Sequence, residues 1–107
     1  MFDELAIDLH KIAVEKGFWP EPDAVDDIFI AKQCMMIVSE VTEVMEAVRK
    51  DKGEEEITKE FADILIRTLD LYTGMVEAGY TRLSLDAMVA EKIDFNKTRP
   101  EKHGVRF

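Results

Sequence analysis

Residues 28–48 read IFIAKQCMMIVSEVTEVMEAV, and this stretch decides the fold. Its apolar residues recur at steps of three and four, which is the period of one face of an α-helix rather than of a β-strand. The apolar face runs from Ile30 to Val48 and includes the single cysteine, Cys34, which we expect to be a small core residue. Glutamates at positions 40, 43 and 46 lie among the apolar residues of this predicted helix. A helix packed into a core would exclude such charges, so they need a chemical explanation.

The sequence on either side of this stretch also predicts helices. The predicted segments are Phe2–Lys16, Asp27–Lys50, Glu54–Ala78 and a fourth that Ser84 caps and that runs to Lys97. Gly17 and Gly79 lie just past two of the predicted ends, and Pro100 closes the last helix. No alternating strand pattern of useful length is present. The predicted fold class is therefore all-α, a four-helix antiparallel bundle with short connections.

The length of 107 residues suits one domain, so we assign residues 1–107 to a single domain. Two long central helices in so short a chain leave an apolar face uncovered. The six methionines suit an adaptable interface. We therefore expect oligomerisation to complete the bundle, as a homodimer or a homotetramer.

The charge distribution limits the kind of partner. The net charge is −9, and residues 1–91 hold 9 basic and 21 acidic residues, whereas residues 92–107 hold 5 basic and 2 acidic ones. An acidic body argues against binding a nucleic-acid polymer, which calls for a basic face. It permits a phosphate ligand, because divalent cations held by carboxylates reverse the local charge.

Three features bear on the compartment. The opening sequence MFDELAIDLHK lacks the basic start and apolar block of a signal peptide. Charged residues interrupt every apolar stretch, so none is predicted to span a membrane. A single cysteine excludes an internal disulfide and a zinc site made of several thiolates. We expect a cytoplasmic protein without a membrane partner.

Two acidic pairs stand out on the long helices. Glu40 and Glu43 lie three residues apart on one helix, and the sequence EFADIL places Glu60 and Asp63 three residues apart on the next. On a helical wheel both pairs fall on one side of the apolar face, the first members at roughly 85° and 75° from its centre and the second at roughly 145° and 135°. Facing carboxylates without a counter-charge would repel each other. A hard divalent cation such as Mg²⁺ resolves that conflict, and Mn²⁺ would fit similarly.

Acidic pairs at this spacing also arise on solvated helix faces. We assign Glu46 and the glutamates at 54–56 to such faces. The alternative function is accordingly a non-catalytic helical oligomerisation or interaction module with acidic surface pairs. A ferritin-like di-iron bundle would need Glu-x-x-His on two helices. Neither His10 nor His103 follows a carboxylate by three positions, so that possibility has little support.

The order of these motifs resembles a known family. The stretch SEVTEVMEA (39–47), a gap of sixteen residues after Glu43, the stretch EFADIL (60–65) and the tail EKIDFNKTRPEKHG (91–104) are similar to the MazG-like all-α nucleoside triphosphate pyrophosphohydrolases. The hallmark of that family is E-E-x-x-E followed by E-x-x-D. One position departs from it, because Ser39 stands where the family has its first Glu.

The resemblance implies both a site and a reaction. It implies that Glu40, Glu43, Glu60 and Asp63 form the catalytic metal site for Mg²⁺, and that Lys92, Asn96 and Arg99 contact the triphosphate. The reaction would be hydrolysis of a nucleoside triphosphate, a deoxy or non-standard one, to a monophosphate and pyrophosphate. Such a hydrolase of nucleotide metabolism would have either a house-cleaning role against non-standard nucleotides or a role in controlling a standard deoxynucleotide pool. The base, the sugar and the carboxylate that acts as general base stay open.

Two further side chains have predicted roles. Trp19 lies in a connector with two prolines, where it could stack on the substrate base with help from Phe18, or else plug the core. Arg67 is expected to pair with a nearby acid. The sequence lacks a P-loop, a dinucleotide-binding glycine motif, H-E-x-x-H and G-x-S-x-G. It therefore gives no support for hydrolysis through a P-loop or through a serine nucleophile.

Overall fold

The computed structural model describes residues 1–99, and every regular element in that range is a helix. The elements are α1 (Phe2–Glu15), the short 3-10 helix η1 (Pro22–Ala24), α2 (Asp27–Arg49), α3 (Glu54–Glu77) and α4 (Leu85–Thr98). The all-α prediction is thus confirmed, and the bounds of the four long helices fall within one residue of those predicted. The predicted stop at Pro100 lies outside the described residues.

Local signals set the helix ends. At the end of α1 the N–H of Gly17 donates to Val14 O (3.0 Å), and the N–H of Phe18 donates to Ala13 O (3.0 Å). This pair of bonds is a Schellman motif, and it requires the left-handed backbone that Gly17 adopts at φ 81°. At the start of α4 the predicted cap is confirmed, because the Ser84 hydroxyl oxygen accepts from the N–H of Ala87.

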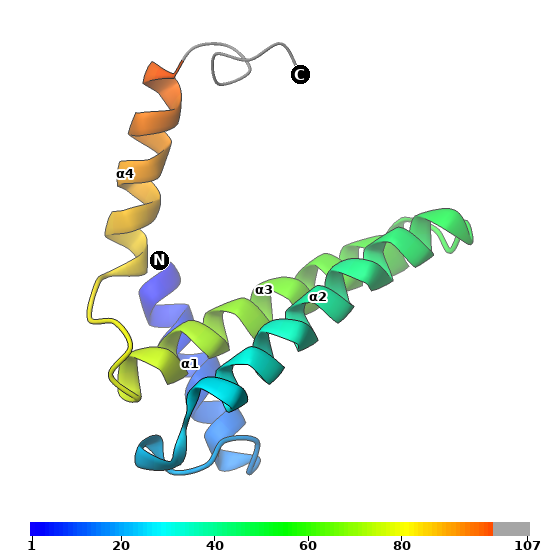
Figure 1. The fold of residues 1–107 in the computed structure, drawn as a ribbon. Helices are drawn as coiled ribbons and strands as arrows, with labels where there is room; N and C mark the ends of the chain where they lie inside the picture. The colour runs from blue at the N-terminus through cyan, green and yellow to red at the C-terminus, as the bar shows by residue number, and fades with distance from the viewer. Residues whose placement is uncertain (100–107) are drawn as a thin grey trace.

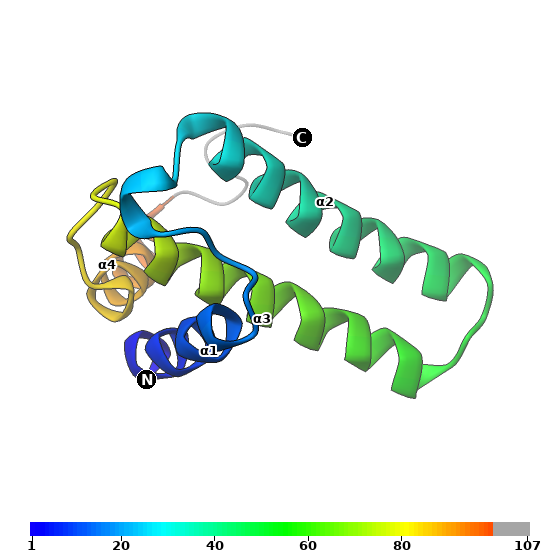
Figure 2. The ribbon, with the colours of Figure 1, turned by 90° about the horizontal axis from the view of Figure 1, so that it is seen from below.

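Helix α3 is the centre of the fold. It pairs with α2 in an antiparallel helical hairpin joined by a short turn, and α1 crosses α3 near its C-terminal half (Figure 1). Seen from below, α1 and α2 lie on different sides of α3 (Figure 2). Side chains on α3 can therefore meet partners from both α1 and α2.

Helix α4 is attached through the N-terminal ends of two helices that cap each other. The Asp86 carboxylate accepts from the N–H groups of Phe2 (2.7 Å) and Asp3 (3.1 Å). In return the Asp3 carboxylate accepts from the N–H of Leu85 (2.8 Å) and from the Ser84 hydroxyl (2.5 Å). From this junction α4 extends away from α2 and α3 (Figure 1). Residues 1–99 thus form a three-helix unit with a projecting helix and do not by themselves close a four-helix bundle.

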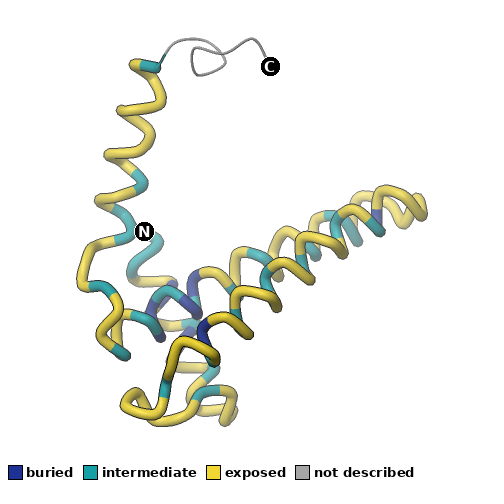
Figure 3. Tube along the Cα trace, viewed as in Figure 1, coloured by how far each residue is buried: buried dark blue, intermediate teal, exposed yellow. Residues whose placement is uncertain are grey.

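The buried core is small; most of it lies where α1 crosses α3, and one buried position lies near the far end of the α2–α3 hairpin (Figure 3). The buried apolar residues among those described are Ala6, Ile30, Ala47, Leu69 and Leu71. Many large apolar side chains stay exposed, including Met35 (63 %), Met45 (64 %) and Phe61 (58 %). The prediction that Cys34 is a core residue is wrong, because it is exposed. Helix α2 has α3 as its main packing neighbour, so much of its apolar face has no cover from residues 1–99.

None of the helices described is both long enough and apolar enough to cross a membrane.

Candidate metal centre and adjoining cleft

Three of the four predicted metal ligands meet between α2 and α3. Glu40 on α2 and Glu60 and Asp63 on α3 each offer one carboxylate oxygen, and these oxygens all lie within 4.8 Å of one another. The antiparallel packing of the two helices brings them together, as the matched positions on the helical wheel predict. Glu43 lies outside this group and is exposed. One turn along α2, its larger angle from the apolar face turns it towards solvent.

The electrostatics of the group show an excess of negative charge. Partial burial and the neighbouring carboxylates of Asp63 and Glu43 raise the pKa of Glu60 above its ordinary value. The Arg67 guanidinium neutralises part of this negative charge, because its Nε donates to Glu40 Oε1 at 2.9 Å. The expected pairing of Arg67 with a nearby acid is confirmed. The Glu40 side chain is 17 % exposed and that of Arg67 is 39 % exposed.

The donor set fits a hard divalent cation. All three side chains offer carboxylate oxygens, which are the ligands that Mg²⁺ and Mn²⁺ prefer. Oxygens no more than 4.8 Å apart can share a centre at about 2.8 Å or less from each, and Mg²⁺ needs about 2.0–2.1 Å. Small side-chain rotations would close that gap. Glu40, Glu60 and Asp63 are therefore the residues that could hold such an ion.

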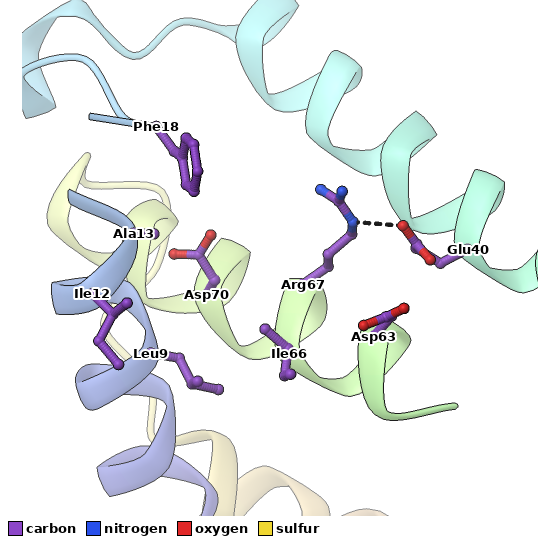
Figure 4. Close-up of a pocket in the computed structure, with 9 residues that line it drawn as sticks. All are labelled: Leu9, Ile12, Ala13, Phe18, Glu40, Asp63, Ile66, Arg67 and Asp70. Atoms are coloured by element: carbon purple, nitrogen blue, oxygen red, sulfur yellow. Dashed lines mark hydrogen bonds and ion pairs between the residues drawn. The ribbon is translucent and has the colours of Figure 1, made fainter. Parts of the chain in front are cut away.

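A cleft of about 350 Å³ adjoins this group. Figure 4 shows Glu40 and Asp63 towards one end of it and Phe18 and Asp70 towards the other, with Arg67 pointing at Glu40. Apolar side chains from α1 and α3 form the wall between the two ends. They are Leu9, Ile12, Ala13 and Ile66. A volume above about 300 Å³ with few polar groups on an apolar wall is typical of small-molecule sites.

A charged stripe on α3 connects the two ends of the cleft. Glu60, Asp63, Arg67 and Asp70 follow one another at steps of three, four and three, which keeps them on one helix face. Asp63, Arg67 and Asp70 line the cleft. Asp70 was not among the predicted site residues, although its regular spacing from Asp63 and Arg67 can be read from the sequence.

Asp70 belongs to a polar network with two rings. The Nδ1 atom of His10 lies 2.8 Å from Asp70 Oδ1, and its Nε2 lies 3.0 Å from a carboxylate oxygen of Glu77. Trp19 Nε1 donates to both oxygens of Asp70, at 3.0 and 3.1 Å. His10 is buried and packs edge-on against the Trp19 ring. This network fixes the carboxylate of Asp70 at the wall of the cleft.

The Trp19 ring lies outside this cleft. It packs on Gly74 of α3 and near Phe29 of α2. This position matches the plug that the sequence also allowed. The neighbouring Phe18 does line the cleft and is 70 % exposed.

The predicted phosphate contacts lie on α4 and apart from the carboxylates of the same chain. Lys92 Nζ lies 5.3 Å from the centre of the Phe95 ring, and the guanidinium carbon of Arg99 lies 5.4 Å from it. Both cations thus gather on one exposed aromatic ring, and Asn96 is also exposed. Within residues 1–99 these three side chains do not join the group formed by Glu40 and its neighbours.

No protein-family model matches this sequence, and comparisons with curated proteins and with solved structures give no match. The assignment of function therefore depends on the motifs and on the geometry described above.

Proposed function

We propose that this protein is a Mg²⁺-dependent nucleoside triphosphate pyrophosphohydrolase of the MazG-like kind. It would hydrolyse a deoxy or non-standard nucleoside triphosphate to a monophosphate and pyrophosphate. The observation that carries the proposal is the convergence of Glu40, Glu60 and Asp63 from two antiparallel helices at one end of a cleft. The family motifs put ligands at these three positions.

The residues of the site have separable roles in this proposal. A bound divalent cation would neutralise charge that develops on the phosphate oxygens during in-line attack by water. Glu40, Glu60 and Asp63 hold the cation, and Glu43 adds negative charge nearby. A carboxylate that is not engaged with the cation can take the proton from the attacking water. The Arg67 guanidinium, which is paired with Glu40, provides a positive charge beside the phosphates.

The cations of α4 would reach the triphosphate in an oligomer. We propose that two or four copies complete a helical bundle and that α4 of one copy brings Lys92, Asn96 and Arg99 to the carboxylates of another. Two observations support this: α4 projects away from its own α2–α3 hairpin, and large apolar side chains on α2 and α3 lack cover. Lys92 and Arg99 would then stabilise the leaving pyrophosphate.

Product analysis tests the reaction. The parent chain with Mg²⁺ is incubated with a panel of ribo- and deoxynucleoside triphosphates, beside Glu40→Gln and Asp63→Asn. Glu55→Gln is the matched control, because Glu55 is exposed near the start of α3 and lies outside the group. We expect monophosphate and pyrophosphate from the parent and the control, and loss of both products in the site variants. Release of diphosphate and inorganic phosphate would show that a different bond breaks.

Mixing two inactive variants tests the role of α4. Glu40→Gln is combined with a chain that carries Lys92→Ala and Arg99→Ala, after unfolding and refolding together. If α4 acts across copies, a mixed dimer contains one site with all its groups intact, and activity returns to about a quarter of the parent level. If α4 acts on the carboxylates of its own chain, the mixture stays inactive.

A second candidate function has its own supporting observation. The exposed apolar side chains on α2 and α3 also suit a non-catalytic interaction module, whose acidic residues serve only as surface charge. Thermal unfolding with and without Mg²⁺ separates the two functions. A metal site stabilises the fold by mass action, whereas an interaction module responds only to general screening.

A further inference from the structure

The far end of the cleft has a chemistry of its own. The carboxylates of Glu40 and Asp63 occupy one end, and at the other end Asp70 and Phe18 meet the apolar wall formed by α1 and α3 (Figure 4). Asp63 and Asp70 are seven residues apart on α3, which is about 10 Å along the helix axis. A nucleotide lying along α3 with its phosphates at Asp63 would place its base near Asp70.

Among residues 1–99, the hydrogen bonds of Asp70 leave one acceptor position free. A carboxylate oxygen can accept about two hydrogen bonds. Oδ1 faces His10 Nδ1 at 2.8 Å and also accepts from Trp19 Nε1 at 3.0 Å, so its capacity is used. Oδ2 accepts only the shared and longer bond from Trp19 (3.1 Å). The Asp70 side chain is 19 % exposed and lines the cleft, so Oδ2 can accept one more donor from a ligand.

Phe18 supplies an aromatic face at the same end. The Schellman motif of α1 holds its backbone, since its N–H donates to Ala13 O, and both residues line the cleft. Its ring is 70 % exposed, although it borders an apolar wall that includes Leu9 and Ile66. An exposed aromatic ring beside an apolar wall suits stacking against a planar base.

We infer that this end of the cleft binds a nucleobase with an exocyclic amino group, which donates to Asp70 Oδ2 while the base stacks on Phe18. A carboxylate accepts well from the 4-amino group of cytosine and has no donor for the keto oxygen at that position in uracil. Only one oxygen is free, so a single donor is read. Asp70 is thus a specificity-determining residue, and the inference builds on the proposed function, which puts the phosphates at Glu40 and Asp63.

A binding experiment without turnover tests this inference. Deoxycytidine and deoxyuridine monophosphate are titrated into the parent chain with Mg²⁺, and binding is followed by calorimetry and by the fluorescence of Trp19. Trp19 is the only tryptophan and bonds directly to Asp70, so a ligand at Asp70 should change its emission. We expect cytosine to bind roughly ten- to hundredfold more tightly than uracil, as for a hydrogen bond to a charged group.

Two variants examine the residues separately. Asp70→Asn keeps an acceptor for Trp19 and presents an amide N–H₂ to the ligand, so the preference should reverse towards uracil. Phe18→Ala should weaken both ligands roughly five- to hundredfold and leave their ratio unchanged. The control is Asp8→Asn, which changes an exposed residue that does not line the cleft and should retain the parent behaviour.

The outcomes separate this inference from the proposed function. Equal affinity of the parent chain for both ligands overturns the base assignment, even if triphosphates are hydrolysed. A preference for cytosine that Asp70→Asn retains also overturns it. Should Asp70→Asn fail to fold, the parent comparison and Phe18→Ala still decide. Cytosine selectivity without hydrolysis of any triphosphate supports the base site and refutes the pyrophosphohydrolase.

Discussion

Divalent cation binding should stabilise the folded chain, and the effect should depend on Glu60. We expect the ion to bind the folded state, in which Glu40, Glu60 and Asp63 meet, and not the unfolded chain. At a free ion concentration ten times the dissociation constant, the gain is about 1.4 kcal/mol. For a domain of this size, that corresponds to a rise of roughly 6–11 °C in the unfolding midpoint.

The response to the ion should also depend on pH. Partial burial and the nearby carboxylates of Asp63 and Glu43 raise the pKa of Glu60 above the 4.5 of a free side chain. Without metal, the folded state therefore favours protonated Glu60. The stabilisation of the folded state by protonated Glu60 is present below pH 4.5 and is lost as the pH rises through the raised pKa of Glu60. Because proton and ion compete for the same oxygen, the stabilisation by Mg²⁺ should fade as the pH falls through that range.

The assay is thermal unfolding followed by circular dichroism, across a series of Mg²⁺ concentrations at neutral pH and near pH 4.5. Glu60→Gln should lose most of the response at neutral pH. Glu55→Gln removes one negative charge from the same helix and should respond like the parent, since Glu55 is exposed and its ion-pair partner among residues 1–99 is Lys59, at 3.6 Å. Equal responses of Glu60→Gln and the parent would refute the reasoning, and so would a response that persists unchanged at acid pH.

Three further substitutions test the fold that positions the site. Gly74→Ala places a methyl group against the Trp19 ring, and such overpacking should lower the free energy of unfolding in denaturant titrations by about 1–3 kcal/mol. Gly17→Ala puts a side chain at φ 81° and should cost about 1–2 kcal/mol in the same titrations. Asp86→Ala removes the acceptor for the first N–H groups of α1, so hydrogen exchange of Phe2 and Asp3 should become faster than in the parent.

Helix positions could be predicted from the sequence because their ends depend on local chemistry. Gly17 and Gly79 supply left-handed residues after α1 and α3, and Ser84 caps α4. The direction of α4 could not be predicted in this way. It depends on hydrogen bonds between Asp3 and Asp86, which are 83 residues apart and whose pairing no local pattern reveals.

The candidate site could be predicted in part. The helical-wheel positions predicted that Glu40 would face Glu60 and Asp63. Glu43 lies at a larger wheel angle from the apolar face than Glu40, which agrees with its exposed position. Asp70 was missed because its role arises from contacts with His10 on α1 and with the connector, not from a pair on its own helix. The burial of the Trp19 ring likewise depends on Gly74, whose missing side chain leaves room for it.

The exchange of caps between α1 and α4 gives α4 the properties of a lever. Helix α4 is held at its N-terminal end by the carboxylates of Asp3 and Asp86. It extends about 21 Å from that point over 14 residues. A tilt of about 10° at that point moves the far end, where Arg99 lies, by about 4 Å. Two short acidic side chains at the N-terminal ends of α1 and α4 thereby control how far the cations at the far end of α4 reach.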